Sequence, residues 1–166
     1  MQAKTHIIGG VAGAAALCLI KDINAVQALP MAAAGAMGAL LPDIDVPGSY
    51  LSRTSFGVRS MSGILTLIFG HRGFFHSLLF TGAMWLTMRF ILMPRFTLLT
   101  SNLIAAFIIG MLSHLVLDSM TYGGIAWFWP FNLRFSLPFQ TGGLFERIFR
   151  LALILFCIYA GANIIF

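Results

Sequence analysis

Long apolar stretches separated by short polar segments dominate the chain. Five of them are candidate transmembrane helices, at residues 5–20, 29–41, 76–93, 98–117 and 148–166. A bilayer core takes about 20 apolar residues, and the last three stretches approach or reach that length. A sixth stretch, at residues 61–69, is too short to cross and is interpreted as a re-entrant or interfacial segment. The pattern predicts an all-α fold: a polytopic membrane helix bundle with about five transmembrane helices, in one domain over residues 1–166.

The first two stretches differ from the others because they are shorter and rich in alanine and glycine. Their glycines are Gly9, Gly10, Gly13, Gly35 and Gly38. Small residues allow helix backbones to approach each other closely. We therefore expect these two helices to form a packed hairpin away from lipid.

Composition supports a membrane protein. Hydrophobic residues make up 59% of the chain and charged residues 9%, and the mean hydropathy is +0.93. Soluble domains are about 25% charged, so soluble, disordered, coiled-coil and nucleic-acid-binding proteins are excluded. The net charge is +5, and with five spans seven of the ten Lys and Arg residues fall on the side of residue 4. The positive-inside rule places that face in the cytoplasm.

The histidines and most of the acids gather at a few points along the chain. These are His6, the pair Asp43 and Asp45, the pair His71 and His76, and the pair His114 and Asp118. With five spans, all four groups lie at the same membrane face. Ionisable groups at membrane depth are costly, which favours a functional role. Carboxylates and imidazoles are the ligands of zinc, iron and manganese.

The spacing of these residues favours a shared metal site. His114 and Asp118 are four residues apart and share one helix face. Asp43 and Asp45 repel each other unless a positive charge lies between them. Both pairs follow or close a helix, where the helix dipole favours a cation. We predict that one or two divalent ions, zinc or alternatively manganese or iron, are held by His6, Asp43, Asp45, His76, His114 and Asp118.

His71 and Arg72 are assigned to catalysis rather than to the metal. His71 and His76 are five residues apart, about 140° around a helix, so they are not expected to share a role. The planar guanidinium of Arg72 suits an anionic group, and His71 can transfer protons near neutral pH. Arg72 could equally be an ordinary positive-inside residue.

Other residues have simpler explanations. His6 could be a hydrated residue at the membrane edge. The aromatic run at 127–131 is expected to form an interfacial belt. Glu146 is interpreted as a helix-start acid that pairs locally with Arg147 and Arg150.

Four motifs follow one another along the chain: Thr5-His6, Leu41-Pro42-Asp43-Ile44-Asp45, Gly70-His71-Arg72-Gly73 with His76-Ser77, and Ser113-His114 with Asp118. In this order they resemble the YdjM-like inner-membrane proteins, a family described as LexA-regulated, membrane-bound, metal-dependent hydrolases. The likeness continues to Glu146-Arg147 and covers nearly the whole chain. It implies a multi-pass protein of the bacterial inner membrane. The chain departs from the family pattern at Phe75, where threonine is usual, so a hydroxyl is lost beside the site.

The leading hypothesis is a membrane-embedded, metal-dependent hydrolase that cleaves a lipid or lipid-linked phosphoester at the cytoplasmic interface. Its partners are membrane lipids, with an amphiphilic lipid as substrate and no nucleic acid. A fainter similarity is to zinc-dependent phospholipase C, an all-helical fold with a similar order of an early His, Pro-Asp and then His-x-x-x-Asp. This similarity points to phosphoester cleavage. One alternative is a structural or regulatory membrane protein whose metal only joins its helices. A second is an ion transporter, although the acids and histidines gather at one face and no repeat is visible.

Overall fold

The computed structural model confirms a helical membrane protein. It describes residues 1–46, 48–50, 62–65, 67, 73–131 and 133–165. The α-helices are α1 (Ala3–Ile20), α2 (Ala25–Leu40), α4 (Leu78–Leu86), α5 (Ser101–Ser119) and α6 (Leu144–Ile165). The 3₁₀ segment η1 (Leu41–Asp45) follows α2, and the 3₁₀ segment η2 (Phe74–His76) precedes α4. A π-helical segment, η3 (Thr87–Leu92), extends α4, and β1 (Ile125–Ala126) pairs antiparallel with β2 (Arg134–Phe135).

Four helical segments among the described residues are long and apolar enough to cross a membrane. They are Ala3–Ile20, Ala25–Asp45, Ser101–Ser119 and Leu144–Ile165. The predicted span at 76–93 forms the shorter apolar helix Leu78–Leu92. The second span begins earlier than predicted, because the side chain of Asn24 accepts a hydrogen bond from the backbone N–H of Gln27 and caps α2.

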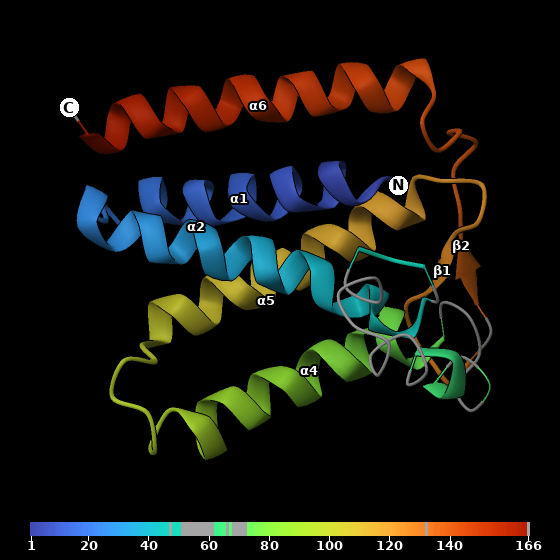
Figure 1. Ribbon diagram of the computed structural model, residues 1–166, viewed down its shortest axis with the longest axis horizontal. Helices are drawn as coiled ribbons and strands as arrows, with labels where there is room; N and C mark the ends of the chain where they lie inside the picture. The colour runs from blue at the N-terminus through green and yellow to red at the C-terminus, as the bar shows by residue number, and fades with distance from the viewer. Residues whose placement is uncertain (47, 51–61, 66, 68–72, 132, 166) are drawn as a thin grey trace.

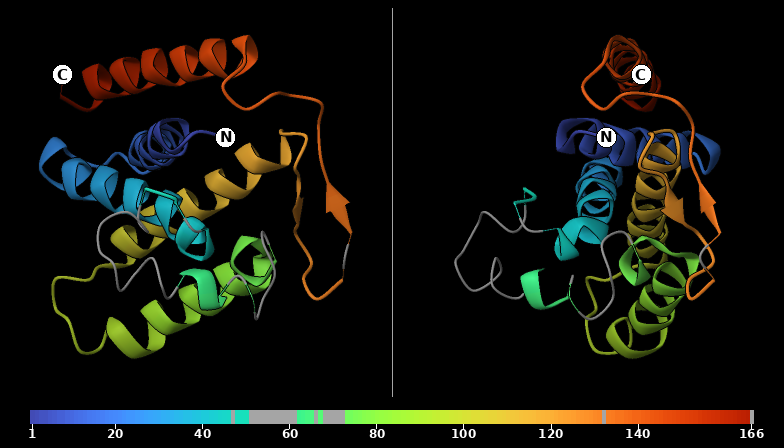
Figure 2. Two further views of the ribbon diagram at one scale, coloured as in Figure 1. Left: turned by 45° about the vertical axis from the view of Figure 1, so that its right-hand side comes forward. Right: turned by 90° about the vertical axis from the view of Figure 1, so that its right-hand side faces the viewer.

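The helices alternate in direction, so five helix ends meet at one end of the bundle. Helices α1, α4 and α6 begin there, and α2 and α5 end there (Figure 1). The small β1–β2 sheet lies at the same end, as Figure 1 and the left view of Figure 2 show. This arrangement brings together segments that are more than a hundred residues apart in the sequence.

Close glycine contacts hold the central helices against each other. A Cβ atom on Gly10 would lie 2.3 Å from the carbonyl oxygen of Gly35, so α1 and α2 touch through their backbones. A Cβ atom on Gly38 would lie 2.0 Å from the carbonyl oxygen of Phe107, and one on Gly110 would lie 2.1 Å from that of Gly35. The α1–α2 hairpin is therefore packed as predicted, and α5 joins it at the same glycines. The expectation that the hairpin lies away from lipid is not met for α2, which leaves Val26, Leu29 and Met37 largely exposed.

Helix α6 lies along α1 and exposes most of its apolar side chains. Leu151, Leu155 and Ile158 are each more than half exposed. Exposed leucine and isoleucine on a helix of this length are typical of a lipid-facing surface. The two buried residues of α6 within the described chain are Glu146 and Ala160.

Candidate metal centre

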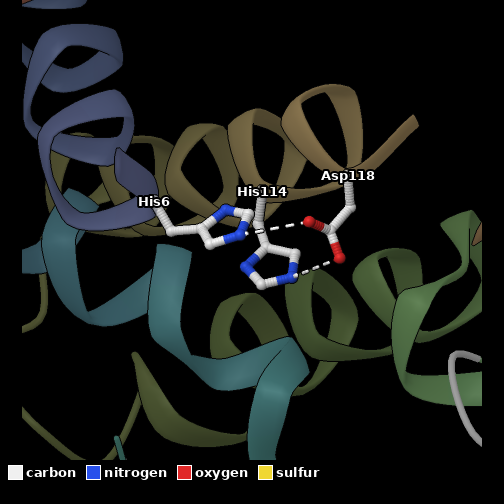
Figure 3. A group of neighbouring side chains, drawn as sticks. All are labelled: His6, His114 and Asp118. Atoms are coloured by element: carbon white, nitrogen blue, oxygen red, sulfur yellow. Dashed lines mark ion pairs between the residues drawn. The ribbon is translucent and has the colours of Figure 1, made fainter. Parts of the chain in front are cut away.

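The six residues predicted to bind metal meet at the end of the bundle where five helix ends converge. They come from α1 (His6), η1 (Asp43 and Asp45), η2 (His76) and the last two turns of α5 (His114 and Asp118). Figure 3 shows the side chain of His6, on α1, beside those of His114 and Asp118, on α5. Five of the six are buried to 1% exposure or less, and Asp43 is 20% exposed. Asp43 is therefore the member of the group that reaches the surface.

Local sequence explains how two of these segments are placed. Pro42 lies at the start of η1, and since it has no N–H group the regular α-helical bonding of α2 gives way to a 3₁₀ turn. This turn carries Asp43 and Asp45 to the end of the bundle. On the other side, Ser77 caps α4 by accepting a hydrogen bond from the N–H of Phe80, which fixes His76 just before the helix.

Two carboxylate oxygens and two imidazole nitrogens form the centre of the group. Asp43 Oδ1 lies 3.5 Å from His76 Nε2 and 3.7 Å from His114 Nε2. Asp118 Oδ2 lies 3.9 Å from His76 Nε2 and 3.8 Å from His114 Nε2. Zinc bonds of about 2.0–2.1 Å in a tetrahedral site put neighbouring ligand atoms roughly 3.3 Å apart. The four atoms are spaced slightly more widely than a tetrahedral set around one ion.

His6 and Asp45 flank these four atoms. His6 Nε2 lies 3.2 Å from the other oxygen of Asp118, Oδ1, and its ring stacks on that of His114 at 3.8 Å. The amino group of Met1 also contacts Asp118 Oδ1. Asp45 Oδ1 lies 3.7 Å from His76 Nδ1, the ring nitrogen that faces away from Asp43. Contacts of this kind, to ligand atoms that do not themselves bind the metal, fix the orientation of the metal ligands.

The hydrogen-bond pattern of the histidines tests whether a metal fits. His114 Nδ1 lies 2.7 Å from the carbonyl oxygen of Ala39, which only accepts, so Nδ1 carries the hydrogen and Nε2 has a free lone pair. Among the described residues, His114 Nε2 and both ring nitrogens of His76 have no hydrogen-bond partner. A buried polar atom without a partner costs about 1–3 kcal/mol. The His and Asp groups fit a divalent ion, which would satisfy Nε2 of His76 and Nε2 of His114.

Among the described residues, two overlapping sets have ligand atoms close enough to share one ion. They are His6, His114 and Asp118, and Asp43, His76 and His114. His114 belongs to both sets, but its Nδ1 is used by Ala39 and only Nε2 remains to bind an ion. One nitrogen lone pair serves one ion. The geometry therefore favours a single ion, with His114 Nε2 as one of its ligands.

The predicted catalytic residues His71 and Arg72 lie outside the described residues. Their assignment stays a prediction. Of the predicted re-entrant segment 61–69, residues 62–65 and 67 are described and are helical. That the segment is re-entrant or interfacial and does not cross the membrane also stays a prediction.

Comparison with known proteins agrees with the predicted resemblance. The model of the family "YdjM inner membrane protein" matches residues 1–166. YvsG of Bacillus subtilis (strain 168) is 39% identical over 150 residues, covering 89% of this chain and 86% of its own length. The inner membrane protein YdjM of Escherichia coli (strain K12) is 30% identical over 171 residues, covering 96% of this chain and 82% of its own. The inner membrane protein YbcI of the same organism is 38% identical over 114 residues, 65% of this chain and 58% of its own.

No solved structure matches the chain. The names of the relatives and the apolar helices agree on a multi-pass protein of the inner membrane, as predicted. The chain belongs to the YdjM inner membrane protein family.

Proposed function

We propose that the protein is a metal-dependent hydrolase that cleaves a phosphoester of a lipid or lipid-linked amphiphile at the cytoplasmic face of the membrane. The observation that carries the proposal is the lone pair of His114 Nε2, which faces the carboxylates of Asp43 and Asp118 at 3.7 and 3.8 Å. A lone pair opposite two carboxylates is repelled unless a cation lies among them. The ion is zinc, with manganese or iron as alternatives, since these metals take imidazole and carboxylate together.

A divalent ion held at such a site makes a bound water more nucleophilic near neutral pH and polarises a phosphoryl oxygen. The chain itself supplies the surroundings. The partly exposed Asp43 marks the side from which a headgroup and water reach the buried residues. His71 and Arg72 precede His76 by a few residues, and we assign proton transfer to the imidazole and binding of the anionic headgroup to the guanidinium.

The position of the centre supports an amphiphilic substrate. The residues of the centre belong to the first turn of α1, the last turns of α5 and the segments η1 and η2. They therefore lie at the end of the bundle where α1 begins and α2 and α5 end (Figure 1). A lipid whose headgroup is hydrated and whose tail stays in the bilayer presents its phosphoester at this depth. The same position counts against transport, because an ion pathway needs polar groups through the membrane depth.

The alternative is a metal that only joins the helices. The burial of His6, His76, His114 and Asp118 favours it, since structural sites are closed to water. The partial exposure of Asp43 favours the hydrolase, because a catalytic site keeps a position for water and substrate.

The test begins with elemental analysis of detergent-purified protein. Wild type is compared with the double variant Asp43→Ala/His114→Ala and with Asp22→Asn, which removes a carboxylate at the exposed turn between α1 and α2. We expect about one equivalent of metal in wild type and in Asp22→Asn, and none in the double variant. Each protein is then incubated with phospholipids and polyprenyl phosphates, with and without added zinc, and phosphate or headgroup release is measured.

Metal-dependent release by wild type and Asp22→Asn, but not by the double variant, would support the hydrolase. Bound metal that stabilises the fold, with no release from any substrate at any metal loading, would favour the joining role. Folded wild-type protein that takes up no metal after reloading would refute the metal centre.

A further inference from the structure

Glu146 is a buried carboxylate that the proposed chemistry does not use. It lies in the first turn of α6 and is 1% exposed. Its Oε1 accepts hydrogen bonds from the backbone N–H of Gln2 at 2.7 Å and from the hydroxyl of Thr5 at 2.5 Å. Its Oε2 accepts one from the N–H of Gly142 at 2.6 Å. The expected local pairing with Arg147 and Arg150 is replaced by contacts that reach across to α1.

These contacts replace a missing cap on α1. Gln2 occupies the N-cap position, but no side chain of that segment accepts a hydrogen bond from the first turn. The first N–H groups of a helix have no partner within the helix and need one from outside. Glu146 supplies it from α6, and Arg150 adds a second link by donating to the side-chain oxygen of Gln2 at 3.0 Å. Negative charge at the start of a helix is also favoured by the helix dipole.

The hydrogen bonds of Glu146 exclude a direct role in chemistry. A carboxylate has about four acceptor positions, and three donors already occupy both of its oxygens. Glu146 is therefore a poor metal ligand and a poor general base. Its contacts hold the first turn of α1, in which Thr5 directly precedes His6.

We propose that Glu146 is a positioning residue of the metal centre: it holds the start of α1 so that His6 Nε2 stays against Asp118. This inference rests on the proposed function, because it assumes that the centre binds metal. Glu146 maintains the contact between His6 Nε2 and Asp118 Oδ1, which are 3.2 Å apart. Without the Glu146 carboxylate, the first turn of α1 has no cap and frays, as uncapped helix ends do.

The test compares zinc dissociation constants of the full-length protein in detergent. Glu146→Gln keeps the size of the side chain but replaces one acceptor by an NH₂ donor. Thr5→Val removes a single donor and keeps Glu146 unchanged. Asp22→Asn is the matched control, because it also removes one carboxylate but lies at the opposite end of α1. We expect Glu146→Gln to weaken zinc binding by about 10–100-fold, the usual effect of losing an outer contact to a ligand.

A second comparison separates positioning from general stability. In a His6→Ala background, Glu146→Gln should cause no further loss of zinc affinity, because the residue through which it acts is already absent. The melting temperature of the metal-free proteins is measured alongside. Thr5→Val should weaken zinc binding less than Glu146→Gln. If Glu146→Gln does not fold, the zinc affinity of Thr5→Val alone tests the positioning role.

Each outcome bears on a different claim. Equal zinc affinity in wild type, Glu146→Gln and Thr5→Val would overturn the positioning role and leave the metal centre intact. Additive losses in the His6→Ala background would also overturn it, since Glu146 would then act by another route. Folded wild-type protein that binds none of zinc, manganese and iron would overturn the proposed function, and this inference with it.

Discussion

The Nδ1 nitrogen of His114 lies 2.7 Å from the carbonyl oxygen of Ala39, so a side chain of α5 is joined to the last turn of α2. The last four carbonyls of a helix have no partner within it, and His114 satisfies one of them. The same contact fixes the tautomer of the ring and turns Nε2 toward Asp43 and Asp118. One hydrogen bond therefore both links α5 to α2 and orients one of the predicted metal ligands.

The first prediction concerns the ligands on α5. His114→Ala or Asp118→Ala should abolish metal binding, because each removes an atom of the central group and leaves its neighbours buried without a partner. We expect the metal content after gel filtration to fall from about one equivalent to background. Asp22→Asn serves as the control and should retain the wild-type content. Metal content that survives all substitutions of the six predicted His and Asp ligands would show that the metal lies elsewhere.

The second prediction concerns the crossing of α2 and α5. A Cβ atom on Gly38 would lie 2.0 Å from the carbonyl oxygen of Phe107, so Gly38→Ala must push the helices apart. Overpacking of this kind costs about 1–3 kcal/mol. We also expect weaker zinc binding, because Ala39 follows Gly38 directly and orients His114. Thermal unfolding and zinc titration measure the two effects.

Gly82→Ala is the matched control for that substitution. Gly82 lies in α4, and a Cβ atom there would have no neighbour within 4 Å among the described residues. Alanine in a helix is favoured over glycine by about 1 kcal/mol, so Gly82→Ala should leave stability unchanged or raise it slightly. If Gly38→Ala behaved like Gly82→Ala, the close contact between α2 and α5 would be absent from the protein in solution.

Spacing and span direction predicted much of the fold and the centre. The four-residue interval between His114 and Asp118 places both on one helix face, and the structure has them there. Alternating spans predicted that His6, the Pro42-Asp43 turn and the end of α5 would share one face. That prediction depends only on counting helices, which long apolar stretches mark clearly.

Contacts that depend on tertiary packing were not predictable. The acceptor for His114 is the backbone carbonyl of Ala39, and no sequence pattern marks a particular carbonyl. Glu146 stands beside Arg147 and Arg150 in the sequence, yet its carboxylate contacts Gln2 and Thr5, because α1 and α6 begin at the same end of the bundle. Neighbours in sequence suggested a local pair, and the helix arrangement overrode it.

The third prediction concerns Arg72. Arg72→Ala should leave the metal content at the wild-type level and raise the KM for an anionic lipid substrate, because the guanidinium is assigned to the headgroup and not to the ion. Arg72→Lys should restore activity only in part, since an ammonium keeps the charge and loses the planar fork. Elemental analysis and the phosphate-release assay check the two halves. Loss of metal in Arg72→Ala would instead place Arg72 among the residues that build the centre.

The fourth prediction concerns removal of the metal. The buried Nε2 atoms of His76 and His114 have no hydrogen-bond partner among the described residues, so an ion that binds them stabilises the folded state over the unfolded one. At an ion concentration 1,000 times the Kd this is worth about 4 kcal/mol. Chelation should therefore lower the Tm by on the order of 10 °C, and zinc should restore it. The double variant Asp43→Ala/His114→Ala should melt at the same temperature with chelator or zinc. A wild-type Tm that changes neither on chelation nor on addition of zinc would mean that the Nε2 atoms of His76 and His114 are satisfied without an ion.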